Sequence, residues 1–182
     1  MKKSLFVPLL SCFLLLSSCN HYVNKSTATQ KDYDYSVSIK INDALSYDKM
    51  EGNSHYKIED EKNPMIDKDS VINISLSKNN LVKKYVELNY LIDYDDSRFD
   101  YTFPKNEIKR IKKNIAFNLK DYSEEIEFIK KIQVTMVDNK YKITTYYPNV
   151  YFRLTVLYVN NEYGTYRFYS QIKPTYQYYD VE

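Results

Sequence analysis

Apolar and polar residues alternate with a period of two along much of this chain, the pattern of a β-strand with one buried face. The clearest case is the segment 71–77, where Ile72, Ile74 and Leu76 share one side. The same alternation predicts further strands at 33–41, 86–94, 99–103, 141–147 and 165–172. Many short strands joined by turn residues are typical of an all-β domain.

The segment 150–159 differs because it is apolar on both sides. A strand that is buried on both faces lies inside a sheet, so we expect this one to be central. The turn 160–164 connects it to the strand at 165–172, with Gly164 able to supply a positive φ. Pro174 ends that last strand, since proline cannot donate to the hydrogen-bond ladder.

The segment 105–114 breaks the alternation. Ile108, Ile111 and Ile115 fall at helical spacing, which predicts one short helix there. The polar segment 42–70 is long for a structureless loop, so a short element is expected inside it.

The segment 123–137 carries two conflicting signals. Ser123 followed by two glutamates has the form of a helix start. Its apolar residues nevertheless share one parity, with Lys130 as the exception, and this favours a strand. The residues 138–140 then predict a hairpin turn.

These elements predict a mostly β protein, an antiparallel two-sheet β-sandwich with one short helix. The alternative is an α+β fold in which helices from 105–131 cover one antiparallel sheet.

The first twenty residues follow another pattern. Lys2 and Lys3 precede an apolar run from 5 to 16, which Pro8 and Ser11 interrupt. The run is shorter than the roughly 20 residues of a membrane-spanning helix. A basic start, an apolar segment and a small-residue junction predict a secretory signal.

The junction Leu16-Ser17-Ser18-Cys19 resembles the lipobox of bacterial lipoprotein precursors. The resemblance implies cleavage between Ser18 and Cys19. It also implies a diacylglycerol on the Cys19 sulfur and an acyl chain, such as palmitate, on its amine. Two or more chains anchor a protein stably. Because Asn20 rather than aspartate follows, the resemblance implies the outer membrane in a cell with two membranes, facing the periplasm or the surface.

The expected organisation is a signal peptide at 1–18, a lipidated cysteine and flexible tether at 19–32, and a single β-rich domain at 33–182.

The chain has 26 basic and 24 acidic residues, and the two leader lysines account for the difference. A balanced charge argues against a nucleic-acid partner. Cys12 and Cys19 are the two cysteines, so the folded domain is expected to have neither a disulfide nor a cysteine zinc site.

Groups for catalysis are few. The two histidines are His21, in the expected tether, and His55, in the long polar segment. Neither belongs to a recognisable constellation with a nucleophile and a carboxylate. The two glycines, Gly52 and Gly164, are isolated, so no phosphate-binding loop is formed. We therefore expect a protein that is not an enzyme and needs no cofactor beyond the lipid.

The densest acidic cluster is a weak candidate for a Ca²⁺ site, because carboxylate oxygens are the ligands of hard cations. Its members are Asp93, Asp95, Asp96 and Asp100. The central glycine and distal glutamate of a calcium-binding loop are not in place, so a solvated turn is the favoured interpretation.

Tyrosine is abundant, with 21 residues, of which eleven lie between 141 and 179. Most of them suit half-buried strands, where the ring packs and the hydroxyl reaches a polar partner. Tyr176, Tyr178 and Tyr179 follow Pro174 and are the candidate binding residues, because they either pack back on the domain or contact a partner.

The function expected from these features is that of a lipid-anchored envelope protein that binds another envelope protein as an accessory or assembly factor. Two alternatives remain. One is a lipoprotein that binds a ligand or polysaccharide through exposed tyrosines, and the other is an inhibitor or immunity lipoprotein.

Overall fold

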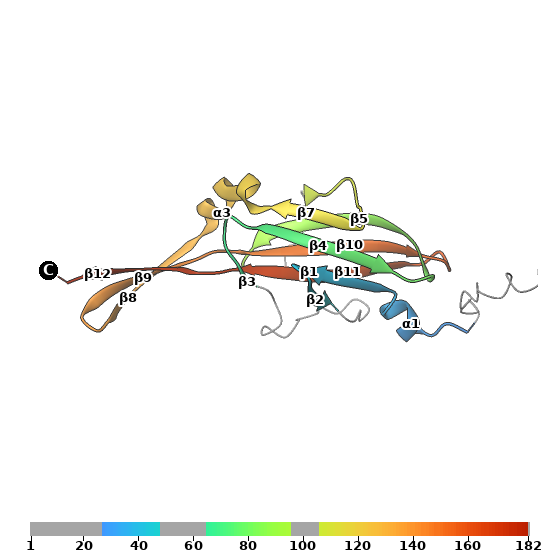
Figure 1. The fold of residues 1–182 in the computed structure, drawn as a ribbon, viewed down its shortest axis with the longest axis horizontal. Coiled ribbons are helices and arrows are strands. Elements are labelled where there is room, and N and C mark those ends of the chain that lie inside the picture. The colour runs from blue at the N-terminus through green and yellow to red at the C-terminus, as the bar shows by residue number, and fades with distance from the viewer. Residues whose placement is uncertain (1–26, 48–64, 96–105, 182) are drawn as a thin grey trace, which may run out of the picture.

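The protein is mostly β and forms a two-sheet sandwich from which a third sheet extends (Figure 1). The computed structural model describes residues 27–47, 65–95 and 106–181. The expected leader, the Ser18-Cys19 junction, both histidines and the predicted strand at 99–103 lie outside these residues. The predicted antiparallel sandwich is confirmed.

One sheet of the sandwich has the strand order β2-β1-β4-β7. These strands are Ala44–Tyr47, Val37–Ile41, Val71–Lys78 and Asn114–Asn118, and all of them pair antiparallel. Alternate residues of β1 and β4 are buried, as their period-two pattern predicts.

The second sheet has the order β3-β11-β10-β5-β6. Its strands are Met65–Ile66, Tyr163–Ile172, Asn149–Tyr158, Val82–Asp93 and Asn106–Glu107. Strand β10 lies in the middle, which confirms the central strand predicted from its two apolar sides. The strands β2 and β3 are the short elements expected inside 42–70.

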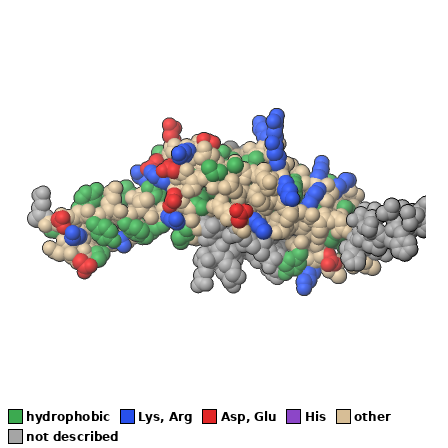
Figure 2. Space-filling model, viewed as in Figure 1, with side chains coloured by type: hydrophobic (Ala, Val, Ile, Leu, Met, Phe, Trp, Pro, Cys, Tyr) green, Lys and Arg blue, Asp and Glu red, His purple; other side chains and the backbone are tan. Residues whose placement is uncertain are grey.

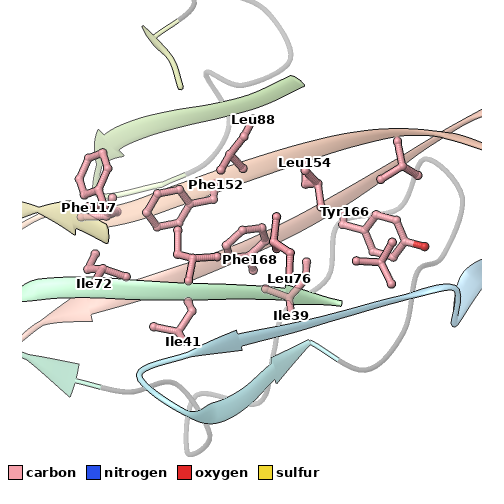
Figure 3. Close-up of a cluster of buried hydrophobic side chains, with 14 of the residues drawn as sticks. Ile39, Ile41, Ile72, Leu76, Leu88, Phe117, Phe152, Leu154, Tyr166 and Phe168 are labelled. Carbon is pink, nitrogen blue, oxygen red and sulfur yellow. The ribbon is translucent and has the colours of Figure 1, made fainter. Parts of the chain in front are cut away.

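The core lies between these two sheets, where their apolar faces meet (Figure 3). Ile39 and Ile72 come from the first sheet, and Phe152 and Leu154 come from the second; none of them is more than 1% exposed. Phe117 of β7 meets Phe152 of β10 edge to face, with ring centroids 5.3 Å apart. Contacts of this kind fix the two sheets against each other.

In the described ranges, three short helical segments accompany the sheets: α1 at Gln30–Asp34, the 3₁₀ segment η2 at Leu119–Tyr122, and α3 at Ser123–Ile129. The strand expected from residue 33 therefore begins at Val37 instead, because α1 takes up the residues before it.

The helix predicted at 105–114 is wrong. Residues 106–107 form β6, and the Ile108 amide donates to the Leu88 carbonyl at 2.8 Å, so the chain runs along β5 there. Ile115 belongs to β7 and lies opposite Ile74. Ile108 and Ile111 pack against the core from the segment between β6 and β7, and Ile115 does so from β7, which gives helical spacing without a helix.

The strand predicted at 123–137 is half right. Its first half is helix α3, as the serine and two glutamates at its start indicate, because acidic side chains favour the first turn. Ile126 is buried, whereas Phe128 is 88% exposed, so the shared parity of these two residues does not reflect a common buried face. The described helical residues of 105–131 are η2 and α3 alone, so the α+β alternative does not hold.

Candidate functional site

A third sheet projects from the sandwich and has the order β12-β9-β8. Its strands are Thr175–Asp180, Lys140–Tyr146 and Lys131–Val137, and we call it the arm. It lies at one end of the long axis of the molecule, and α1 lies toward the other end (Figure 1). Every residue of β8 and β12 is exposed, in contrast to β10, where alternate residues are fully buried.

The arm is an outward continuation of the hairpin formed by β10 and β11. Val150 lies opposite Ser170 in the sandwich, and five residues further out Thr145 lies opposite Thr175, so the register is unchanged. Pro148 and Pro174 lie between the two regions. Because proline does not donate to a hydrogen-bond ladder, the two residues interrupt the pairing where the arm leaves the sandwich, which we call the body.

A tight turn at Asp138 and Asn139 closes the outer end of the arm. Both residues have positive φ, 50° and 59°, and Val137 pairs with Lys140 across them. This is the geometry of a two-residue type I′ hairpin, in which Asp and Asn tolerate the left-handed conformation. The hairpin predicted from residues 138–140 is thus confirmed.

The cross-strand register divides the side chains of the arm between two faces, because directly paired residues point to the same side. Val134, Ile143 and Gln177 form one such row. We call this side the apolar face, and it has no charged residue. It consists of Ile132, Val134, Met136, Tyr141, Ile143, Thr145, Thr175, Gln177 and Tyr179.

The opposite side carries three lysines and one aspartate, and we call it the basic face. It consists of Lys131, Gln133, Thr135, Val137, Lys140, Lys142, Thr144, Tyr146, Tyr176, Tyr178 and Asp180. Several of these side chains meet one another, and Thr144 in the middle strand is only 5% exposed. Lys140 pairs with Asp180 at 2.9 Å, and the Lys142 ammonium lies 4.6 Å from the centre of the Tyr176 ring.

The apolar face is open along its length. Ile132, Val134 and Met136 are 58–60% exposed, and Figure 2 shows hydrophobic side chains gathered along the arm. Tyr141 and Tyr179 are 42% and 52% exposed. Contiguous exposed apolar side chains mark interaction sites in soluble proteins, whereas scattered single ones do not.

The candidate tyrosines do not form one platform. They belong to β12, but Tyr176 and Tyr178 lie on the basic face and Tyr179 lies on the apolar face. All three are more than half exposed. The tail thus pairs with β9 and still leaves its rings open, and the alternation Tyr176-Gln177-Tyr178 is the sequence signal for this division.

Other tyrosines are structural. The hydroxyl groups of Tyr158 and Tyr166 lie 3.1 Å apart, and both donate to the Tyr33 carbonyl. The Ser36 hydroxyl lies 2.9 Å from that of Tyr166. Burial raises the pKa of both phenols above the usual value, so they stay protonated as donors. This cluster ties α1 to the second sheet.

A charged cluster beside the arm is also structural. The Glu127 carboxylate of α3 accepts from Lys68 at 2.8 Å and from Lys130 at 2.7 Å. The hydrogen bonds from Lys130 and Lys68 lower the pKa of Glu127, so this carboxylate stays ionised and is not suited to act as an acid. The cluster joins α3 to the segment between β3 and β4.

The acidic candidate cluster is only partly within the described residues. Asp93 ends β5 and its carboxylate accepts from the Tyr94 amide at 2.7 Å, while Asp95 is exposed. Asp96 and Asp100 lie outside these residues. Among the residues described, no three His, Cys, Asp or Glu side chains come together as metal ligands would.

The fold and the arm define this protein as a mostly β sandwich with an exposed, amphipathic three-stranded extension. No protein-family model matches the chain, and comparisons with curated proteins and with solved structures find no significant match. In the ranges that the structure describes, no helix has both the length and the apolar character needed to cross a membrane.

Proposed function

We propose that this protein is a lipid-anchored, non-enzymatic protein of the bacterial cell envelope that binds another envelope protein through its arm, as an accessory or assembly factor. The anchor is proposed at Cys19, within the lipobox-like sequence. The observation that carries the binding proposal is the outer strand β8, which no other described strand pairs on its outer edge and which lies at the end of the molecule away from α1.

Most of the edge of β8 lacks the features that usually protect such strands. Proteins protect exposed edges with charges, prolines or bulges. Lys131 at the start of β8 is charged, but residues 132–137 read Ile-Gln-Val-Thr-Met-Val and include no charge, proline or glycine. An edge of this kind can accept an added strand from a partner, with backbone hydrogen bonds providing affinity.

The position of the arm fits an anchor at Cys19. That residue precedes α1 by 11 residues. An extended chain of this length reaches at most about 40 Å, so the α1 end stays near the membrane. The arm would then point toward partners away from the lipid surface.

The tyrosine-based ligand site has less support, because the three tail tyrosines are divided between two faces.

Membrane attachment is tested by Cys19→Ser in the full chain, with Cys12→Ser in the leader as the matched control. Removal of the acceptor thiol should release the protein from membranes washed with high salt, while Cys12→Ser should stay attached. Retention of the Cys19→Ser protein after the wash would exclude the lipid anchor.

Partner binding is tested by photo-crosslinking in intact cells of the native host. A crosslinking residue replaces Thr135 on β8 or, as the control, the exposed Thr165 on β11. We expect an adduct with a different envelope protein from position 135 and none from 165. Equal labelling at both positions, or no adduct at 135, would contradict the proposal; an adduct with a second copy is recognised by its mass and does not count.

A further inference from the structure

The apolar face of the arm has the composition of a sheet interior without the cover that an interior has. Apolar side chains come from all three strands: Ile132, Val134, Met136, Tyr141, Ile143 and Tyr179. Where the two sheets of the sandwich cover each other, residues of the same kind, such as Ile39 and Ile72, are fully buried.

A small sheet of three strands depends on its hydrophobic face for stability, and removing that face from water is favourable. The described part of the sandwich does not cover the apolar face, since Ile132, the residue of this face on β8 that lies nearest the sandwich, is as exposed as Met136 at the outer end. The contacts between the arm and Tyr94, which directly follows β5, lie at the base of the arm and on its basic face. The Lys131 ammonium lies 3.8 Å from the centre of the Tyr94 ring, and the Tyr94 hydroxyl donates to the Tyr146 carbonyl at 2.9 Å.

We propose that the occupant of the apolar face is a second copy of this chain, so that two arms pack face to face and form a small two-sheet sandwich. The charge distribution favours self-association in this orientation. The apolar face brings no charge into the interface, and the lysines of the basic face remain in water on the outside of both sheets.

The area available is sufficient for a specific dimer. Five of the six apolar side chains are 42–60% exposed and Ile143 is half-buried, so together they provide roughly 500 Å² per copy, or about 1,000 Å² in total, the least area that a specific interface needs. Thr145, Thr175 and Gln177 add a polar margin on the same face. Interfaces with an apolar centre and a polar rim are the usual form.

The geometry is compatible with two chains that start from one membrane. A two-fold axis parallel to the strands superposes the arms and keeps both α1 ends on the same side (Figure 1). Ile143 is the middle residue of the middle strand, in the central row with Val134 and Gln177. A two-fold axis through the centre of the interface therefore brings Ile143 opposite its symmetry mate.

Site-specific crosslinking of the full chain in cell membranes tests the proposal. Packed sheets lie about 10 Å apart, beyond the reach of a disulfide, so a bis-maleimide of that span is used. Ile143→Cys should give a species of twice the monomer mass. The neighbouring Lys142→Cys, on the basic face and equally half-buried, should remain monomeric, as should the parent chain, whose cysteines are Cys12 and Cys19.

A charge placed on the apolar face provides a second, independent test. Val134→Lys, added to Ile143→Cys, should abolish the double-mass species, because two ammonium groups would be buried without partners. The adjacent Thr135→Lys should leave it unchanged. Val134 is exposed in the single chain, so the unfolding midpoint of the sandwich serves as a check that the Val134→Lys protein remains folded.

Three results would overturn the proposal: no double-mass species from Ile143→Cys, equal crosslinking from Ile143→Cys and Lys142→Cys, or an adduct with a different protein in place of the second copy. The last result would leave the proposed binding of an envelope partner intact. Conversely, a dimer without any adduct at position 135 would retain this inference and remove the envelope partner.

Discussion

Gly164 and the ring of Tyr158 occupy neighbouring space inside the second sheet. No glycine among the described residues has a positive φ, and the turn before β11 uses Asn161 instead, at φ 68°. The expectation that Gly164 supplies the turn conformation is therefore wrong. A Cβ on Gly164 would overlap the Tyr158 hydroxyl and lie 2.5 Å from the ring carbon that bears it. Only glycine leaves room at position 164 for the ring of Tyr158, whose hydroxyl belongs to the hydroxyl cluster of Tyr158, Tyr166 and Ser36.

Replacement Gly164→Ala should lower the free energy of unfolding by about 1–3 kcal/mol, the usual cost of overpacking a core. The Tyr158 ring has little room to move, because it is 3% exposed and its hydroxyl contacts Tyr33 and Tyr166. Chemical denaturation of the full chain measures the change, and the exposed neighbour Thr165→Ala should change stability by no more than about 0.5 kcal/mol. Equal stability of Gly164→Ala and the parent chain would refute the steric argument.

Among the elements, strands with one buried face could be predicted because their period of two reflects burial directly. β4 and β10 are the clearest examples, with buried residues at alternate positions. Irregularities could not be predicted in this way. Val86 shares the parity of Leu88 but is 38% exposed, because a bulge separates the pairs of Glu87 and Tyr85 with β10.

The arm shows what a sequence pattern leaves open. The alternation of Ile132, Val134 and Met136 predicts a strand with an apolar face, and β8 confirms it. The same pattern does not say whether the body covers that face, because the path of the chain beyond Pro148 and Pro174 depends on long-range pairing. The apolar face as a whole could therefore not be predicted as a candidate site, although one of its residues, Tyr179, is among the candidate tyrosines of the tail.

The turn of the arm allows a test at the level of this element. Asn139→Ala should disorder the β8–β9 hairpin, because alanine at positive φ costs roughly 1–2 kcal/mol, whereas Asn139→Gly should keep it intact. Limited proteolysis of the full chain would measure this as faster cleavage within 131–146 for alanine than for glycine. Identical cleavage patterns, or a shift in the unfolding midpoint of the sandwich itself, would contradict the view of the arm as a separate extension.

At the scale of the whole molecule, the sandwich holds two different ends apart. The hydroxyl cluster joins α1 to one end of the second sheet, and the hairpin of β10 and β11 carries the arm beyond the other end (Figure 1). The sandwich is closed by its own core, whereas the apolar face and the edge of β8 are open. We therefore expect the protein to associate with another chain through the arm.

Amide hydrogen exchange of residues 131–137 measures whether another chain covers the arm. The full chain is measured in membranes from the cells that make it, beside Val134→Lys in the same membranes. If another chain covers the arm, β8 should exchange slowly in the parent protein and much faster in the variant, while β10 exchanges alike in both. Rapid exchange of β8 in both proteins would show that the arm stays uncovered and would contradict the account.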